Sequence, residues 1–217
     1  MNYFKLIFSN KSILRIFQQE IIKKFKIEGN VIEFGASDMI HKNFCHSNLE
    51  NCNITYSNIN SSNKEFLNLD LQKKITVETK YDCIVIFNVL EHLFDPNLAF
   101  RNLSTICKKD GKIIGSTPFI FRVHGAPKDY SRFTKDHLIR LLKLNNFENI
   151  EVIELGTGPF LACISLLRSY LKYIPIFYQL LLLSSLLIDK LIKLFIKTDP
   201  KKIYPIGYVF FATLGKG

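Results

Sequence analysis

Short apolar runs alternate with amphipathic segments along most of the chain. Continuous apolar runs of about four to eight residues are typical of strands buried on both faces, whereas apolar residues about three and four positions apart indicate helices. The runs predict strands at 31–34, 54–59, 65–69, 81–87, 112–117, 150–155 and 205–213. The amphipathic segments predict helices at 12–25, from 95 to about 106, and at 134–144. This alternation predicts an α/β domain with a largely parallel sheet.

Three polar residues stand where the predicted helices begin. Ser12, Asp95 and Thr134 each precede a helical pattern and can accept a hydrogen bond from an amide of the first turn. Pro96 suits the first position of the helix that follows Asp95. Gly29 is expected to lie beyond the end of the first helix.

The two ends of the chain carry all of its excess positive charge. Residues 1–29 hold six Lys/Arg and two acidic residues, and residues 159–217 hold eight and two. Residues 30–158 hold fifteen of each, so the net charge of +10 belongs to the ends. Because these ends are also rich in bulky apolar side chains, the pattern favours an anionic membrane surface as partner, and we expect no nucleic acid.

Both ends are expected to be helical. Residues 1–29 form a basic, apolar segment in which charges interrupt every apolar stretch, so we do not expect a signal peptide. Residues 159–203 form an apolar insertion before the last predicted strand, with sixteen uncharged residues from Tyr173 to Ile188. A spanning helix needs about 20 apolar residues. We therefore expect a pair of helices that cap the domain or lie in a membrane interface, with a single-pass anchor as the remaining alternative.

Composition narrows the class of protein. With 47% hydrophobic residues the chain can form a core, which excludes intrinsic disorder. Its five Cys are scattered and form no Cys-x-x-Cys pair, as expected for reduced thiols in a cytoplasmic protein. The same scatter argues against a disulfide framework or a structural zinc site.

One passage resembles a known family. Residues 81–96 read YDCIVIFNVLEHLFDP, which is similar to the fourth-strand region of class I S-adenosylmethionine-dependent methyltransferases. Residues 108–114 (KKDGKII) resemble that family's turn into the fifth strand. Residues 124–134 (HGAPKDYSRFT) resemble a stretch of type 11-like members that often accompany polysaccharide synthesis. The resemblance implies a single domain over 1–217 with a Rossmann-like, doubly wound, mostly parallel sheet of seven strands, and S-adenosylmethionine as cofactor.

The resemblance also implies where that cofactor binds. The implied contacts are Glu33, Gly35, Ala36, Ser37, Asn60, Asp70 and Asn88. In the turn after the first strand, Ser37 and Met39 replace two glycines of the family pattern. Asn60 aligns with an acid that accepts from the ribose hydroxyls, and its neutral amide lacks that acid's charge assistance.

Transfer to a hydroxyl requires a group that takes the acceptor's proton. The candidates are His124, His92 and Asp129. Tyr130, Arg132 and Phe133 are expected to shape the acceptor pocket, where Arg132 either clamps a phosphate or pairs with Asp129. Glu91 and His92 alone do not make a metal site, so we expect no required metal.

These observations predict methyl transfer to a hydroxyl of a glycan or lipid-linked intermediate. The protein is then cytoplasmic, with peripheral contact at the inner membrane face. A small-molecule acceptor such as a quinone precursor stays open. The alternative is a non-catalytic Rossmann-like binding module at a membrane surface, whose altered 35–39 turn no longer admits the cofactor.

Overall fold

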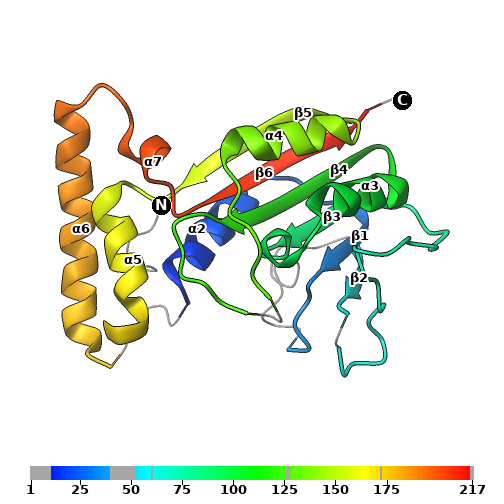
Figure 1. Ribbon diagram of the computed structural model, residues 1–217, viewed down its shortest axis with the longest axis horizontal. Helices are drawn as coiled ribbons and strands as arrows, with labels where there is room; N and C mark the ends of the chain where they lie inside the picture. Colours follow the sequence, from blue (N-terminus) through cyan, green and yellow to red (C-terminus); the bar gives the residue numbers. More distant parts are fainter. Residues whose placement is uncertain (1–10, 40–51, 60, 126–127, 172, 216–217) are drawn as a thin grey trace.

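Six strands form a single sheet in the computed structural model, which describes residues 11–39, 52–59, 61–125, 128–171 and 173–215 (Figure 1). The strands are β1 (Gly29–Phe34), β2 (Cys52–Ser57), β3 (Tyr81–Phe87), β4 (Cys107–Pro118), β5 (Phe147–Leu155) and β6 (Gly207–Leu214). Their spatial order is β2-β1-β3-β4-β6-β5, and only β6 runs antiparallel to its neighbours. The predicted doubly wound, mostly parallel α/β sheet is confirmed.

The predicted strand at 65–69 is wrong, so the described chain has six strands where we expected seven. Leu67 makes only an isolated bridge to Ser57, at the outer edge of β2. With only one bridge at the edge of the sheet, this segment is too weakly paired to form a strand.

The three helices with a predicted capping residue each begin directly after that residue. The helices are α2 (Ile13–Ile22), α3 (Pro96–Ile106), α4 (Lys135–Leu144), α5 (Pro159–Leu171), α6 (Pro175–Phe195) and α7 (Pro200–Ile203), with the 3-10 turn η3 (Leu90–His92). Ser12, Asp95 and Thr134 accept from the amides three residues ahead, at 3.2, 2.9 and 3.3 Å. The first helix ends at Ile22, three residues before the predicted end.

The two faces of the sheet are covered by different helices. Alternate residues of one strand serve the two sides, since Ile84 belongs to the core beneath α3 and α4 while Val85 belongs to the core beneath α2 and α5. Both residues are completely buried, as predicted for a strand covered on both faces.

Helices α5 and α6 pack against each other at one end of the sheet (Figure 1). Asp189 of α6 is buried, and its carboxylate accepts from the Thr157 hydroxyl at 2.7 Å. It also accepts from the Phe160 and Leu161 amides at 3.0 and 3.1 Å. An acid at a helix N-terminus satisfies amides that have no partner within the helix, so Asp189 fixes α6 to the start of α5.

Helix α6 is long and apolar enough to cross a membrane by length and composition, and little of it is buried in the protein. The Asp189 contacts hold it against the domain instead of leaving it separate. Residues 1–10, which belong to the predicted N-terminal segment, lie outside the described residues.

Candidate active site

A cavity of about 230 Å³ opens at the carboxyl ends of β1, β2 and β3. Strand order reverses here, because β2 lies on one side of β1 and β3 on the other. In open α/β sheets this switch point is where ligands bind. Of the predicted cofactor residues, Gly35, Asp70 and Asn88 line the cavity, together with His92.

Gly35 keeps one wall of this cavity free of side chain. Its φ is +68°, in the left-handed region that favours glycine. A Cβ at this position would lie 2.4 Å from Cγ2 of Val89, which also lines the cavity. The backbone of the turn can therefore approach a ligand closely, as a nucleoside-containing cofactor requires, and the residues present fit such a group.

Three other predicted cofactor residues stand outside the cavity wall. Glu33 is buried within β1, and the buried Ala36 donates its amide hydrogen to the carbonyl of Ser57 at 3.2 Å. The Ser37 hydroxyl accepts from the Met39 amide at 3.3 Å. These residues shape the turn that carries Gly35, and their direct contact with cofactor stays a prediction.

The second strand ends earlier than its apolar pattern suggests, which changes the polar residue found at its tip. β2 ends at Ser57, so Asn58 follows the strand and lines the cavity. Its amide group donates to the Ala36 carbonyl at 2.8 Å and joins the tips of β1 and β2. The predicted Asn60 lies outside the described residues. Sequence reasoning missed Asn58 because Asn58 and Ile59 continue the strand-like pattern, so the end of the strand was predicted two residues too late.

Helix α2 is joined to the strand ends by a buried amide. Gln18 donates from Nε2 to Asn88 Oδ1 at 2.6 Å and to Ser116 Oγ at 2.7 Å. Asn88 has a φ of 56°, so the chain turns sharply as it leaves β3. Gln18 lies within an ordinary amphipathic helix, and nothing in the sequence identifies it.

The structure brings the three candidate proton acceptors together. The rings of His92 and His124 meet edge to face, with centroids 5.0 Å apart. Nδ1 of His124 lies 3.3 Å from Oδ2 of Asp129, which also accepts from the His124 backbone amide at 2.9 Å. Since His92 lines the cavity, this group stands at its border.

Arg132 pairs with Asp129, the second of the two roles considered for it. Its Nη2 donates to Asp129 Oδ2 at 2.7 Å and to the Arg122 carbonyl at 3.2 Å. Hydrogen bonding to Arg132 holds the pKa of Asp129 well below its usual range. Burial, aided by the neighbouring His92, lowers the pKa of His124. At neutral pH the site therefore presents a neutral imidazole beside a carboxylate.

The two aromatic residues predicted at the acceptor pocket differ in exposure. Tyr130 is exposed, and its ring lies 5.6 Å from the exposed ring of Phe94. Phe133 is only 1% exposed and belongs to the core cluster of α3 and α4. Its side chain packs in this core, and its predicted role in shaping the acceptor pocket stays a prediction.

Glu91, which the sequence analysis considered only as a metal ligand, has an unusual environment that sequence reasoning missed. It is 0% exposed, and neither carboxylate oxygen has a hydrogen-bond partner within the described ranges. Burial raises the pKa of Glu91 to about 7. Its backbone carbonyl accepts from the amides of Tyr130 and Ser131 at 2.7 and 3.3 Å. These bonds hold the segment 129–133, which carries the residues predicted to shape the acceptor pocket.

Glu91, His92 and His124 also form a loose set of metal-type donors. One donor atom from each lies within 4.8 Å of the others. Ligands of a tetrahedral zinc ion stand closer, at about 3.4 Å, given metal–nitrogen distances of about 2.0–2.1 Å. These side chains would need to move inward to bind an ion, and the expectation of no required metal stays a prediction.

Comparisons with known proteins agree with this geometry. The family model described as methyltransferase domain matches residues 10–152. The search of curated proteins gives no match.

Solved structures share the fold at low sequence identity. A SAM-dependent methyltransferase from Archaeoglobus fulgidus is 14% identical, with a TM-score of 0.55 over 98% of this chain and 100% of its own. An S-adenosylmethionine-dependent methyltransferase from Clostridium acetobutylicum is 11% identical, with a TM-score of 0.56 over 98% and 96%. The phosphoethanolamine N-methyltransferase 2 of Haemonchus contortus, in complex with S-adenosyl-L-methionine, is 14% identical, with a TM-score of 0.58. The match covers 98% of this chain but 56% of that enzyme, so the chain spans little more than half its length.

Proposed function

The chain belongs to the methyltransferase domain family, and from that premise we propose that it transfers a methyl group from S-adenosylmethionine to a hydroxyl of a glycan or lipid-linked intermediate. The observation that carries the proposal is the cavity at the switch point, with Gly35 opening its wall. When bound, the cofactor supplies a methyl group activated by a sulfonium sulfur. The protein's part is to align the acceptor and manage its proton, and orientation alone contributes up to about 7–11 kcal/mol.

Residues that follow β1, β2 and β3, together with Asp70 in the connection between β2 and β3, would hold the cofactor. Gly35 lets the backbone approach, and Asp70 and Asn58 offer oxygen acceptors for its polar groups. Asn88, fixed by Gln18, lines the same cavity where the chain leaves β3. These residues bind and orient the cofactor and take no part in the chemistry.

The pair His124 and Asp129 favours a hydroxyl acceptor. A neutral imidazole can take the proton that a hydroxyl loses as it is methylated. The charge on Asp129 then stabilises the imidazolium, while Arg132 keeps that carboxylate ionised and in place. An amine acceptor that arrives unprotonated has less need of such a base, so this pair supports O-methyl transfer.

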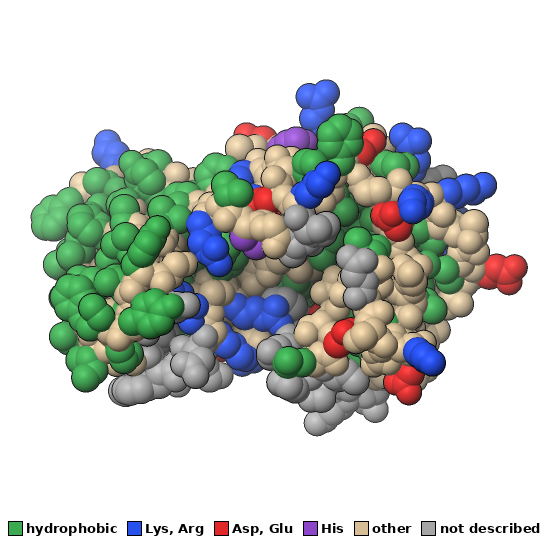
Figure 2. All heavy atoms as spheres, turned by 60° about the horizontal axis from the view of Figure 1, so that its bottom comes forward, with side chains coloured by type: hydrophobic (Ala, Val, Ile, Leu, Met, Phe, Trp, Pro, Cys, Tyr) green, Lys and Arg blue, Asp and Glu red, His purple; other side chains and the backbone are tan. Residues whose placement is uncertain are grey.

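The surface of α5 and α6 supports contact with a membrane. Figure 2 shows apolar side chains gathered over this lobe, with Lys and Arg in the hollow beside it. The exposed apolar residues of α6 include Ile176, Phe177, Leu180, Leu183, Leu187, Leu191, Leu194 and Phe195. Asp189 fixes α6 to α5. We therefore propose that this apolar face lies on the cytoplasmic surface of the membrane and that α6 does not cross the bilayer.

The cofactor proposal is tested by titration calorimetry with S-adenosylmethionine and S-adenosylhomocysteine. We expect micromolar binding that is lost in Gly35→Arg, because the new side chain enters the cavity. Thr105→Arg, which adds the same charge at an exposed site, should bind normally. A folded protein that gives no heat with either ligand would support the non-catalytic binding module instead.

The membrane proposal is tested by flotation with phosphatidylcholine vesicles, with and without phosphatidylglycerol. We expect flotation with the anionic vesicles, and its loss in the double variant Leu180→Asp/Leu187→Asp. Leu144→Asp changes an exposed leucine on α4 and is the matched control. Equal flotation of all three proteins would refute the assignment of this face.

A further inference from the structure

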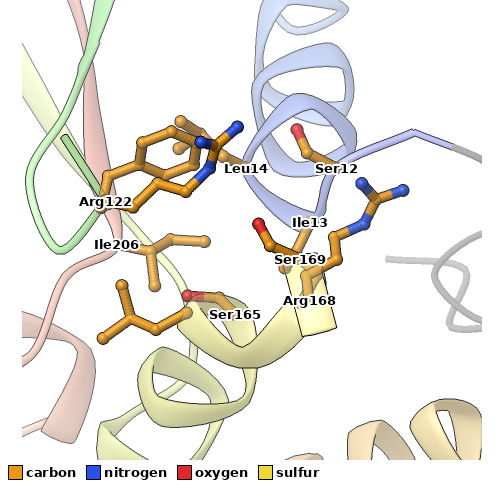
Figure 3. A pocket seen from close by; sticks show the side chains of 10 residues that line it. Ser12, Ile13, Leu14, Arg122, Ser165, Arg168, Ser169 and Ile206 are labelled. Carbon is orange, nitrogen blue, oxygen red and sulfur yellow. The ribbon is translucent and has the colours of Figure 1, made fainter. Parts of the chain in front are cut away.

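A second cavity, of about 140 Å³, lies between the first turn of α2, the helix α5 and the segment that follows β4 (Figure 3). Its wall includes Ser12, Arg122, Ser165, Arg168 and Ser169, and we call it the arginine pocket. Figure 3 shows the guanidinium groups of Arg122 and Arg168 on two sides of this space, with the hydroxyls of Ser12 and Ser169 between them.

The chemistry of this wall suits an anion. Among the described residues, those that line the pocket include two guanidinium groups and three hydroxyls, and no carboxylate. One Arg168 nitrogen donates to the Lys11 carbonyl at 3.1 Å, which holds the side chain in place. Guanidinium forks match the oxygens of a phosphate ester geometrically, and the hydroxyls of Ser12 and Ser169 add neutral donors, whereas the Ser165 hydroxyl donates to the Ala162 carbonyl at 2.7 Å.

The rest of the wall is apolar and continues into an exposed apolar surface. Leu14 and Ile206 form part of the pocket, and Leu166 of α5 stands at it with its side chain exposed. The neighbouring α5 and α6 carry the apolar face described above. A ligand with a phosphate group and a hydrocarbon chain would satisfy both surfaces at once.

The arginine pocket is also connected to the proton-accepting pair. Phe121 lines the pocket, and its ring centroid lies 5.2 Å from that of His124. His124 in turn meets His92, which lines the cofactor cavity. Arg132 joins the two regions, since it donates both to Asp129 and to the carbonyl of Arg122.

We propose that the arginine pocket is the phosphate subsite of a lipid-borne acceptor, which binds its phosphate ester between Arg122 and Arg168 and directs the attached polar group toward His124. This inference rests on the proposed methyl transfer, whose acceptor class it narrows. The phosphate clamp first considered at Arg132 is thereby assigned to two other arginines, because Arg132 is engaged with Asp129.

The test compares three probes by calorimetry on the full chain. Decyl phosphate, below its micellar concentration, carries both phosphate and chain; inorganic phosphate carries the charge alone; decyl maltoside carries the chain alone. We expect decyl phosphate to bind most tightly. Arg122→Gln and Arg168→Gln should each weaken it about tenfold, the effect of losing a charge-assisted hydrogen bond. Arg140→Gln, an exposed arginine on α4, should change nothing.

Leu166→Ser separates the two parts of the ligand. It should weaken decyl phosphate and leave inorganic phosphate unchanged. Inorganic phosphate that binds as tightly as decyl phosphate would overturn the lipid assignment in favour of a soluble phosphate ester. Arginine variants that bind decyl phosphate normally would overturn the subsite itself.

Binding of S-adenosylhomocysteine is measured on the same samples. All arginine variants should keep it, because neither arginine lines the cofactor cavity. If decyl phosphate binds and S-adenosylhomocysteine does not, the methyl-transfer proposal fails while the subsite stands. Arg122 lies on an exposed segment, so its variant is expected to fold even if the Arg168 variant, which loses the Lys11 contact, does not.

Discussion

Glu91→Gln should change the pH dependence of stability by an amount that the structure sets. Glu91 is completely buried at η3, and no hydrogen bond from the described chain reaches its carboxylate. Burial disfavours the ionised form and raises its pKa to about 7, from an ordinary value of 4.5. Glutamine has nearly the same shape and does not titrate, so the substitution removes the proton equilibrium with little change in packing.

The sign and the magnitude follow from proton linkage. Between the two pKa values the folded carboxyl keeps its proton while the unfolded chain has lost it, so the stabilisation is complete below the unfolded pKa and is lost as the pH rises through the folded pKa. A shift of about 2.5 pKa units at about 1.4 kcal/mol each corresponds to about 3 kcal/mol. Between about pH 4 and pH 8 the wild-type protein should therefore lose about 3 kcal/mol of unfolding free energy relative to Glu91→Gln.

The assay is urea unfolding of both proteins at these two pH values. EDTA is present throughout, so that no cation at Glu91, His92 and His124 can hold the carboxylate ionised. Glu65→Gln, which removes an exposed carboxylate, is the control and should follow the wild type. If Glu91→Gln and the wild type keep a constant difference across this range, the carboxylate is not neutral in the folded protein and the reasoning is refuted.

Three further changes test other parts of the structure. Gly35→Ala should weaken S-adenosylhomocysteine binding, because residue 35 has a positive φ and the added Cβ clashes with Val89. Adding Val89→Ala should restore part of the loss, whereas unchanged binding in Gly35→Ala would contradict the cavity assignment. His124→Gln should slow methyl transfer to a hydroxyl about 10²–10⁴-fold while cofactor affinity is kept, and an unchanged rate would remove His124 as the base. Asp189→Ala should lower the unfolding free energy, measured in urea, by about 2–4 kcal/mol. Asp199→Ala, at the short helix α7, is the control and should have a much smaller effect. Equal effects of the two substitutions would contradict the role of Asp189 as the link between α5 and α6.

The features that the sequence predicted well depend on neighbouring residues. A helix start is decided by one side chain and the amides of the next turn, so Ser12, Asp95 and Thr134 identified their helices. The buried strand at 81–87 was found with its exact ends because its apolar run is nearly continuous, and in the structure it pairs with a strand on each side. For the same reason the order of strands and helices was enough to predict the fold class.

The features that were missed depend on residues far apart in the chain. Gln18 matters only because α2 brings it to Asn88 and Ser116, about 70 and 98 positions away. Glu91 is unusual because its surroundings bury it, and no pattern within η3 shows this. Arg122 and Arg168 come from separate elements and meet at one cavity only in the folded chain. Local periodicity contains none of this information.

The altered turn after β1 bears on the choice between an enzyme and a non-catalytic module. Replacement of two family glycines by Ser37 and Met39 would close the cofactor cavity if either side chain entered it. In the structure neither residue lines the cavity, and Met39 is 54% exposed. The position where a side chain would obstruct the cavity wall is Gly35, which is retained. The substitutions therefore fall where the turn tolerates side chains, which supports a working cofactor site over a degenerate one.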